Sequence, residues 1–554
     1  MDKILVTINY YVREKFWCSI RNLCDEELRK GQDPVLVFWK AFGIFKEGNV
    51  TEALRELTRV QERREITLAA CIALIHYHER CRNVDQEAID TLTLEMDNRE
   101  EMASDRDLST ATTFLWHCQQ FKRAGQLCQK IIDNAGGGAL QNSVCLKGWI
   151  YLSAPKEELQ QKSAAFFEQA VAEDAPGQPK HLESMLGKAK VFEKSKKYDL
   201  ALETLSEVAI QNKDFFPALL EKTKIHMVNG DWEQALETVQ KVLVKDRQNV
   251  EGLRIYSFYL LTREHDIDYV CEKLDELVTA MKFNEGRNAD LFYNMSRLFA
   301  RYCGRREPVL EKTLKMLDEA ILLAPENADY HSEIAYQKCM LNDYTTAYQI
   351  YQKAITFDET NQTPLYGMIY CKIKQDQLED AGQQLDFLIE ISENHEKTSD
   401  HAYLEAIICW RHKQNKEQAI KLLDLALNLH ITQTKSSQSN IDFYIRLSAD
   451  FLLQLAQEYL VHCGSKPLAP SQQAPKHLVK ATKLLENVTK QNQGLTEAQV
   501  LLAKCRWLNN DLTGAFKEIH ECLEKDPTMV EAHILGALIN SENKNMKAAE
   551  INLQ

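Results

Sequence analysis

The stretch DWEQALETV at residues 231–239 is the clearest instance of the pattern that decides the fold. Its small residue, Ala235, is followed four positions later by Val239 and three positions after that by Val242. Offsets of four and seven residues place three side chains on one stripe of an α-helix. The same stripe recurs in YDLALETL at residues 198–205 and in YTTAYQIY at residues 344–351. Each segment is therefore predicted to be a helix with a small residue where a neighbouring helix can approach.

The small residue recurs with a period of 34 residues. This spacing separates Ala201 from Ala235, Ala347 from Ala381, Ala481 from Ala515 and Ala515 from Ala549. Such a period is the sequence signature of stacked helix pairs. We expect about fourteen pairs, whose second helices carry these anchor residues: Ala53, Ala88, Ala124, Ser163, Ala201, Ala235, Val270, Thr313, Ala347, Ala381, Ala419, Ala481, Ala515 and Ala549. The spacing drifts at Ala88, Val270 and Thr313.

A second amphipathic helix is predicted upstream of each anchor, again with a small residue at the crossing point. Ala189 precedes Ala201 in this way, and Gly148 precedes Ser163. Because no single pair can bury its apolar stripe alone, the pairs must stack into one continuous core. The sequence therefore predicts an all-α fold that resembles the tetratricopeptide repeat (TPR). We expect a TPR solenoid in which antiparallel helix pairs form a right-handed superhelix.

Length and composition agree with a helical array. Of 554 residues only 20 are Gly and 12 are Pro, which is too few turn formers for many short strands. The formal net charge of −14 argues against a nucleic-acid-binding protein, which needs a basic surface to displace counterions from phosphate. No apolar run approaches the roughly 18 residues that a membrane-spanning helix needs, so we expect no direct insertion into a membrane.

The ends of the array differ from its middle. Residues 1–30 are predicted to form an N-terminal helical cap whose apolar side chains, Ile8, Tyr11, Phe16 and Ile20, are available for docking. Residues 31–430 are predicted to hold about eleven TPR pairs, and residues 476–554 hold the remaining pairs. Ala549 opens the second helix of the last pair, and the sequence stops five residues later. We therefore expect the last pair to be truncated and the sequence to be a fragment of a longer array.

The period is interrupted between Ala419 and Ala481, which lie 62 residues apart. The excess lies in residues 431–475, which we expect to hold a long helix near residues 441–462 flanked by two mobile polar loops. These loops are interpreted as a plain insertion, with a partner-binding or modified loop as the alternative.

The sequence contains little that predicts catalysis or metal binding. In HYHERC at residues 76–81, His76 and His78 face different sides of a helix, so only His78 and Cys81 could share an ion. Ordinary histidines packed between helices are the favoured interpretation. The glycine run at residues 134–139 lacks the Lys-Ser/Thr of a phosphate-binding loop and follows no predicted strand. We therefore expect no catalytic residues, no metal and no cofactor.

Protein binding is the function that remains. Tyr336 lies on the predicted inner face of one pair, and Tyr366 and Tyr370 lie on that of the next. Tyrosine is frequent at interface hot spots, so these three residues are candidates for a partner-binding cluster. The alternative is that they fill the core of the repeat. The inner-face positions lack the Lys, Asn and Arg pattern of TPR domains that clamp the acidic C-termini of chaperones.

Several strings are more specific than the repeat. They are INYY at residues 8–11 with REK at 13–15, ALREL at 53–57, LFYN at 291–294 with CGR at 303–305, FDET at 357–360, DFLL at 450–453 with EYL at 458–460, and AF at 515–516 leading to CLE at 522–524. In this order they resemble the tetratricopeptide repeat protein 21 family, the all-TPR subunit of intraflagellar transport complex A. The resemblance covers the whole chain but does not separate the two paralogues of the family.

This resemblance implies a ciliary scaffold. Its partners would be the WD40/TPR subunits of complex A and a small, largely disordered subunit. It would support retrograde transport and the delivery of membrane receptors to the cilium, from the cytoplasm, the cilium and the ciliary base. The alternative is a TPR adaptor of another assembly, such as a co-chaperone or a ubiquitin-ligase scaffold.

Overall fold

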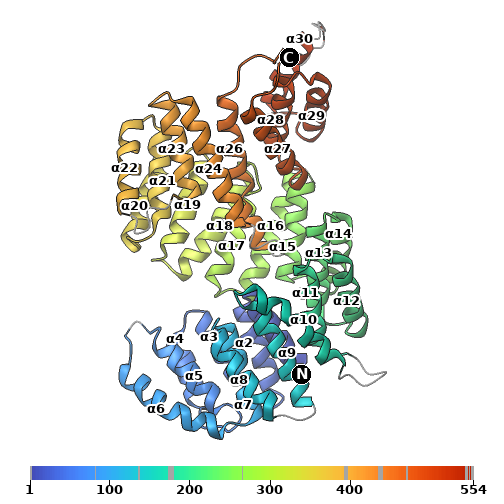
Figure 1. The fold of residues 1–554 in the computed structure, drawn as a ribbon, viewed down its shortest axis with the longest axis vertical. Helices are drawn as coiled ribbons and strands as arrows, with labels where there is room; N and C mark the ends of the chain where they lie inside the picture. Colours follow the sequence, from blue (N-terminus) through green and yellow to red (C-terminus); the bar gives the residue numbers. More distant parts are fainter. Residues whose placement is uncertain are drawn as a thin grey trace. The chain divides into compact units, whose positions relative to one another are not determined.

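The computed structural model describes residues 3–81, 83–134, 138–172, 180–264, 266–391, 397–434, 441–469 and 472–542, with 547 and 550. These residues form helices and connecting turns, and no strand occurs among them. The predicted all-α, TPR-type fold is confirmed, because consecutive helices pack side by side as antiparallel pairs (Figure 1). Within the described part of the chain, no helix combines the length and apolarity needed to cross a bilayer.

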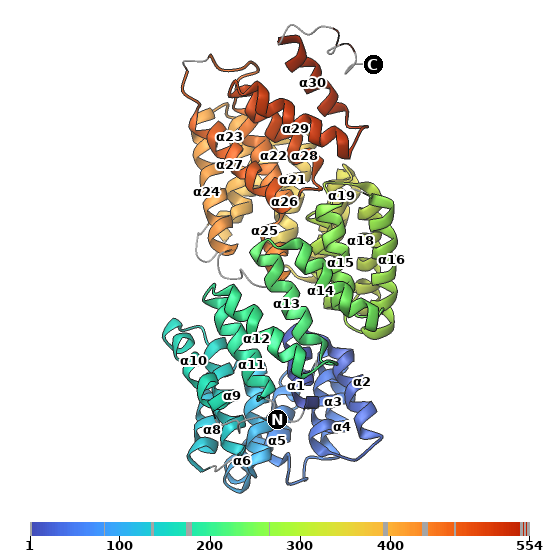
Figure 2. The same cartoon turned by 90° about the vertical axis from the view of Figure 1, so that its right-hand side faces the viewer.

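The chain divides into two compact units. The first comprises Met1–Gly252 and Thr279–Leu291, and the second comprises Leu253–Val278 and Phe292–Gln554. The helices of the first unit are α1 (Lys3–Glu14), α2 (Trp17–Leu28), α3 (Pro34–Lys46), α4 (Val50–Thr58), α5 (Thr67–His78), α6 (Gln86–Met102), α7 (Asp105–His117), α8 (Phe121–Asn134), α9 (Gly138–Ser153), α10 (Glu157–Ala172), α11 (Leu182–Lys194), α12 (Tyr198–Gln211), α13 (Phe216–Asn229) and α14 (Trp232–Lys245). In this unit α8 to α12 lie side by side (Figure 2).

Three helices contribute residues to both units, namely α15 (Val250–Arg263), α16 (Ile267–Asn284) and α17 (Ala289–Ala300). The remaining helices belong to the second unit: α18 (Glu307–Leu323), α19 (Ala328–Met340), α20 (Tyr344–Phe357), α21 (Gln362–Lys374), α22 (Leu378–Ile391), α23 (Ser399–Arg411), α24 (Lys416–Thr434), α25 (Ile441–Leu447), α26 (Ala449–Val461), α27 (Lys476–Gln491), α28 (Thr496–Leu508), α29 (Leu512–Lys525) and α30 (Val530–Glu542).

The predicted anchor residues lie in the second helices of the pairs, apart from Ala549, which falls outside the described residues. All of the described anchors except Ala88 are buried: Ala53, Ala124, Ser163, Ala201, Ala235, Val270, Thr313, Ala347, Ala381, Ala419, Ala481 and Ala515. In α6 the buried residue is Ile89, one position beyond Ala88. The register predicted for this helix is therefore shifted by one residue.

Turns within the pairs share a residue in the left-handed backbone conformation. Gly230 has φ 86°, and both Asn342 and Asn510 have φ 62°. Glycine has no Cβ to clash there, and asparagine tolerates this conformation better than most residues. The following residue begins the second helix: the side chains of Asp343 and Asp511 accept hydrogen bonds from backbone N–H groups of the first turn. The turn chemistry thus fixes where each second helix starts.

Close helix crossings depend on glycine, as the sequence predicts for Gly148. This residue on α9 and Gly187 on α11 both face the ring of Phe167 on α10. A Cβ atom would lie 2.8 Å from that ring at Gly148 and 2.2 Å from it at Gly187. Both distances are too short for carbon atoms, so the aromatic ring occupies the space that the two absent side chains leave.

Helix α1 of the predicted N-terminal cap lies against the first helices of successive pairs. The guanidinium of Arg13 lies 4.3 Å from the ring centroid of Trp149 on α9 and donates a 2.7 Å hydrogen bond to Glu183 on α11. Glu14 forms a 2.8 Å ion pair with Lys224 on α13. These partners lie far along the sequence, which is why a local pattern could not place α1.

Apolar burial and a distant carboxylate hold the N-terminal segment. Of the predicted docking residues, Ile8, Phe16 and Ile20 are buried and Tyr11 is half-buried. Glu285, which follows α16, accepts a 2.8 Å hydrogen bond from the backbone N–H of Ser19 and a 3.1 Å bond from that of Cys18. A carboxylate at this position satisfies the open N–H groups at the start of α2.

The structure also corrects the interpretation of residues 431–475. Helix α24 continues to Thr434, so the first predicted loop begins later than residue 431, and residues 435–440 lie outside the description. The long helix expected near residues 441–462 is two helices, α25 and α26. They are separated at Ser448, whose φ of 46° is incompatible with a continuous right-handed helix.

Helix α25 is held against α15 by an aromatic contact. Tyr444 on α25 packs against Phe258, with ring centroids 5.0 Å apart.

Candidate functional site

The second unit contains an open pocket of about 670 Å³. Its walls come from the first helices α19, α21 and α23, from α24 to α26, and from α17 with the turn that follows it. All three tyrosines that the sequence singles out, Tyr336, Tyr366 and Tyr370, line this pocket. Sequence reasoning thus identified residues that the fold brings together.

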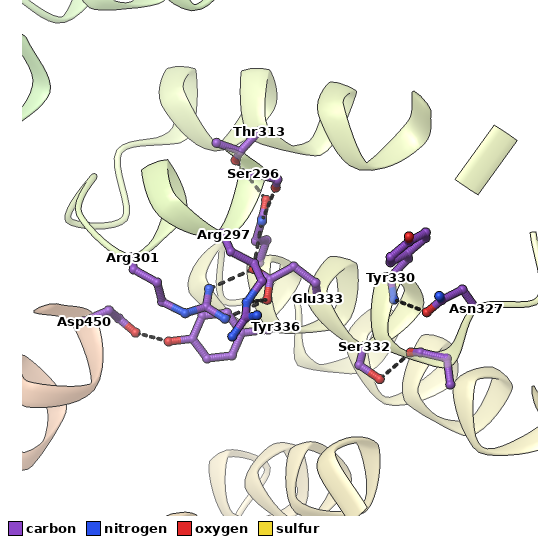
Figure 3. A network of polar contacts seen from close by, with 12 residues as sticks. Ser296, Arg297, Arg301, Thr313, Asn327, Tyr330, Ser332, Glu333, Tyr336 and Asp450 are labelled. Atoms are coloured by element: carbon purple, nitrogen blue, oxygen red, sulfur yellow. Dashed lines mark hydrogen bonds and ion pairs between the residues drawn. The ribbon is translucent and has the colours of Figure 1, made fainter. Parts of the chain in front are cut away.

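An ion pair between Arg301 and Glu333 is central to one wall of the pocket (Figure 3). Two N–H groups of Arg301 donate to the two carboxylate oxygens of Glu333, at 2.8 Å and 2.6 Å. Gln337 donates to Glu333 at 3.0 Å and to Ser296 at 2.7 Å. Although burial opposes the charge, Glu333 raises the pKa of Arg301 above its ordinary value. The guanidinium of Arg301 is therefore a charged and fixed part of the wall.

Tyr336 connects this wall to α26. Its hydroxyl donates a hydrogen bond to Asp450, which also accepts a 2.6 Å bond from Gln454. The backbone N–H of Asp450 donates to the carbonyl of Arg301 at 3.1 Å. Burial, followed by the negative charge of Asp450, raises the pKa of Tyr336 well above its usual value. The hydroxyl of Tyr336 is therefore bound within the chain, and contact of Tyr336 with a partner stays a prediction.

Tyr366 and Tyr370 have looser surroundings. The hydroxyl of Tyr366 donates a long hydrogen bond of 3.5 Å to Gln362, and its ring lies edge-on to His401. The ring of Tyr370 lies edge-on to Tyr344, with centroids 6.4 Å apart. Both side chains are partly exposed in the pocket. They therefore remain candidates for contact with a partner.

Three arginines in the pocket were missed by sequence reasoning. Arg297, Arg301 and Arg305 are spaced four residues apart, and all three line the pocket. Arg297 lies over the ring of Tyr293, 5.1 Å from its centroid, and Arg301 lies 3.8 Å from the centroid of Tyr336. The spacing of four predicts one face of a continuous helix. However, α17 ends at Ala300 and Arg305 has φ 60°, so the turn after α17 carries Arg301 and Arg305 to the pocket.

The histidine cluster at residues 76–81 is not a metal site by its geometry. His76 is buried, with Arg80 3.0 Å from its Nδ1 and the thiol of Cys118 3.7 Å from its Nε2. Burial, with help from the nearby cations Arg80 and Lys46, lowers the pKa of His76 to about 4. Among the residues that the structure describes, no group of three or more His, Cys, Asp or Glu is placed to hold an ion.

Two family profiles match consecutive parts of the chain. The profile "Tetratricopeptide repeat protein 21 N-terminal ARM repeat" matches residues 8–236, and "Tetratricopeptide repeat protein 21 second ARM domain" matches residues 272–544. Human Tetratricopeptide repeat protein 21B is 32% identical over 554 residues, which is 100% of this chain and 42% of that protein. Human Tetratricopeptide repeat protein 21A is 27% identical, over 96% of this chain and 40% of its own.

The chain thus spans less than half the length of these two relatives. Among solved structures, yeast Tom70 aligns with a TM-score of 0.34 and 14% identity, over 81% of this chain and 96% of its own.

Proposed function

Because this chain belongs to the tetratricopeptide repeat protein 21 family, we propose that it acts as a non-enzymatic scaffold subunit of intraflagellar transport complex A. In this role it supports retrograde ciliary transport and the delivery of membrane receptors to the cilium through protein–protein contacts. The observation that carries the proposal is the match of two consecutive family profiles over residues 8–236 and 272–544.

The repeat architecture supports a scaffold role. Stacked helix pairs give an extended surface on which many weak contacts build affinity and geometry without chemistry. The pocket in the second unit is lined by tyrosine and arginine, which are residue types enriched at interface hot spots. The partners we propose are the WD40/TPR subunits of complex A and its small, largely disordered subunit. The proposed location is the cytoplasm, the cilium and the ciliary base.

The test is affinity purification of the tagged full-length protein from ciliated cells, with chemical crosslinking and mass spectrometry. We expect complex A subunits among the crosslinked partners and the tag in the cilium and at its base. A matched pair of variants on α20 provides the control. Ala347→Trp overfills a buried position and is expected to reduce recovery, whereas Gln349→Trp changes an exposed position and is expected to preserve it.

Two results would contradict the proposal. One is recovery of a soluble, intact protein without any complex A subunit. The other is reproducible crosslinking to chaperones or to ubiquitin-ligase subunits in place of complex A, which would favour the adaptor role.

A further inference from the structure

We propose that the pocket of the second unit binds an extended peptide through an acidic side chain held between Arg297 and Arg305. This inference rests on the proposed function, since it names the chemistry of one contact that the scaffold makes. The pocket differs from the buried packing between repeats, because Arg297, Arg305, Tyr366 and Tyr370 line it and are partly exposed.

The first step of the argument is the difference between the three arginines. Arg301 is saturated by the two oxygens of Glu333. Arg297 reaches the same carboxylate only at 3.9 Å, and Arg305 reaches Asp450 only at 3.8 Å. Within the described residues no side-chain hydrogen bond from Arg297 or Arg305 is formed, and the buried Nε of Arg297 has no hydrogen-bond partner. Two guanidinium groups therefore retain donors for a carboxylate, which they bind strongly in bidentate geometry.

The second step concerns the acidic groups of the same wall, which are already engaged. Glu333 accepts from Arg301 and Gln337, and Asp329 accepts a 2.7 Å bond from Asn361. Asp450 accepts from Tyr336 and from Gln454. Glu333 and Asp329 are thus bound within the wall, whereas Oδ1 of Asp450 has no hydrogen-bond partner and lies 3.8 Å from the Nε of Arg305. An incoming carboxylate therefore competes with Asp450 for Arg305, and with little else for Arg297. A local cluster of cations in a chain of net charge −14 is the electrostatic complement of an acidic partner.

The third step is the size and lining of the pocket. Its volume of about 670 Å³ lies within the roughly 300–1,000 Å³ typical of ligand pockets, and suits a few residues of extended chain. The tyrosine rings at Tyr293, Tyr366 and Tyr370 supply apolar faces for the side chains that flank the acidic residue. Both arginines can be reached from solvent, because 32% of the Arg297 side chain and 25% of the Arg305 side chain are exposed. The ligand class is therefore an acidic residue within an extended, partly apolar segment.

The experiment uses the purified chain of residues 1–554 and a library of random eight-residue peptides displayed on phage. Enriched peptides are synthesised with a fluorescein label, and their Kd is measured by fluorescence anisotropy. We expect the enriched peptides to share an Asp or Glu at one position, and the corresponding amide to bind at least about tenfold more weakly. Arg297→Ala and Arg305→Ala are expected to cause a similar loss. Neither variant should weaken the amide peptide further, because arginine and carboxylate act as a pair.

Arg506→Ala is the matched control. Arg506 lies on α28, outside the pocket, and its side chain is 27% exposed, which is similar to the two pocket arginines. Its removal is expected to leave the Kd unchanged. Thermal unfolding of each variant verifies that the second unit is intact. The comparison of the acidic peptide with its amide uses the parent protein alone, so it does not depend on the folding of any variant.

The proposal is overturned if no peptide is enriched, if the enriched peptides lack a common acidic position, or if the amide peptide binds within twofold of the acid. This assay contains no complex A subunit, so its failure leaves the crosslinking result untouched. Conversely, if the peptide binds as expected but no complex A subunit is recovered, only the scaffold assignment is overturned.

Discussion

The ammonium nitrogen of Lys224 on α13 lies 2.8 Å from a carboxylate oxygen of Glu14 at the end of α1. Two further carboxylates share this cation, Glu221 at 3.0 Å and Glu251 at 3.3 Å. Although burial opposes the charge, these carboxylates raise the pKa of Lys224 well above its ordinary value. A single buried cation thus joins α1 to two helices from the other end of the first unit.

Lys224→Met is expected to destabilise the first unit strongly. The substitution keeps most of the length of the side chain but removes the cation that the buried Glu251 shares with the half-buried Glu14 and Glu221, which costs about 3–5 kcal/mol of unfolding free energy. Urea denaturation followed by circular dichroism measures the change. Lys241→Met is the control, because Lys241 pairs with Glu237 on an exposed face of α14. Equal midpoints for both variants would show that the buried cluster contributes nothing.

Tyr336→Phe tests the link between α19 and α26. Removing the hydroxyl leaves buried Asp450 with one donor fewer, which costs about 1–3 kcal/mol. The readout is the free energy of unfolding of the second unit. Tyr344→Phe serves as the control, since its hydroxyl donates to Asn342 at the surface and its loss is expected to have little effect. A Tyr336→Phe midpoint equal to that of the parent would contradict the contact.

Gly187→Ala and Gly125→Ala should have opposite effects. A Cβ at Gly187 would meet the ring of Phe167 at 2.2 Å, so packing must shift at a cost of about 1–3 kcal/mol. Gly125 lies within α8 and has open space around its Cβ position, so alanine is expected to stabilise that helix by up to about 1 kcal/mol. Melting temperatures from differential scanning calorimetry measure both changes. The prediction fails if the two shifts have the same sign.

Acid should destabilise the protein through His76. Its pKa is lowered to about 4 in the folded state, against an ordinary value of about 6.5, so the unfolded chain binds the proton first. The stability that neutral His76 contributes is complete above about pH 6.5 and is lost as the pH falls towards about 4. Melting temperatures between pH 7 and pH 4 should therefore fall less steeply for His76→Asn than for the parent. His520→Asn, at an exposed position on α29, should follow the parent curve.

Local periodicity was sufficient to predict the helix pairs. Ala335 on α19 and Ala347 on α20 are only 12 residues apart in the sequence. The spacing of small residues within one repeat therefore predicts the packing of its two helices. The exception is α6, where the buried residue is Ile89 rather than Ala88. This helix buries little else, so no strong apolar stripe fixes its register.

Contacts between distant segments were beyond the reach of such patterns. The bond from Arg13 to Glu183 spans 170 residues, and that from Tyr336 to Asp450 spans 114. Tyr336, Tyr366 and Tyr370 could be grouped because they lie on successive repeats. The position of α26 beside these tyrosines could not be predicted, because the break between α25 and α26 at Ser448 depends on backbone geometry and leaves no apolar pattern in the sequence.

The position of α1 has a consequence for synthesis in the cell. This helix leaves the ribosome well before its partner Glu183, which is 170 residues later in translation. At roughly 5–20 residues per second, that interval lasts roughly 10–30 s. Glu285, which closes the start of α2, follows later still. Throughout this time α1 has α2 beside it but lacks its native contacts with α11 and α13. A segment that is made early in the first unit therefore completes its native contacts late, only after α13 has been synthesised.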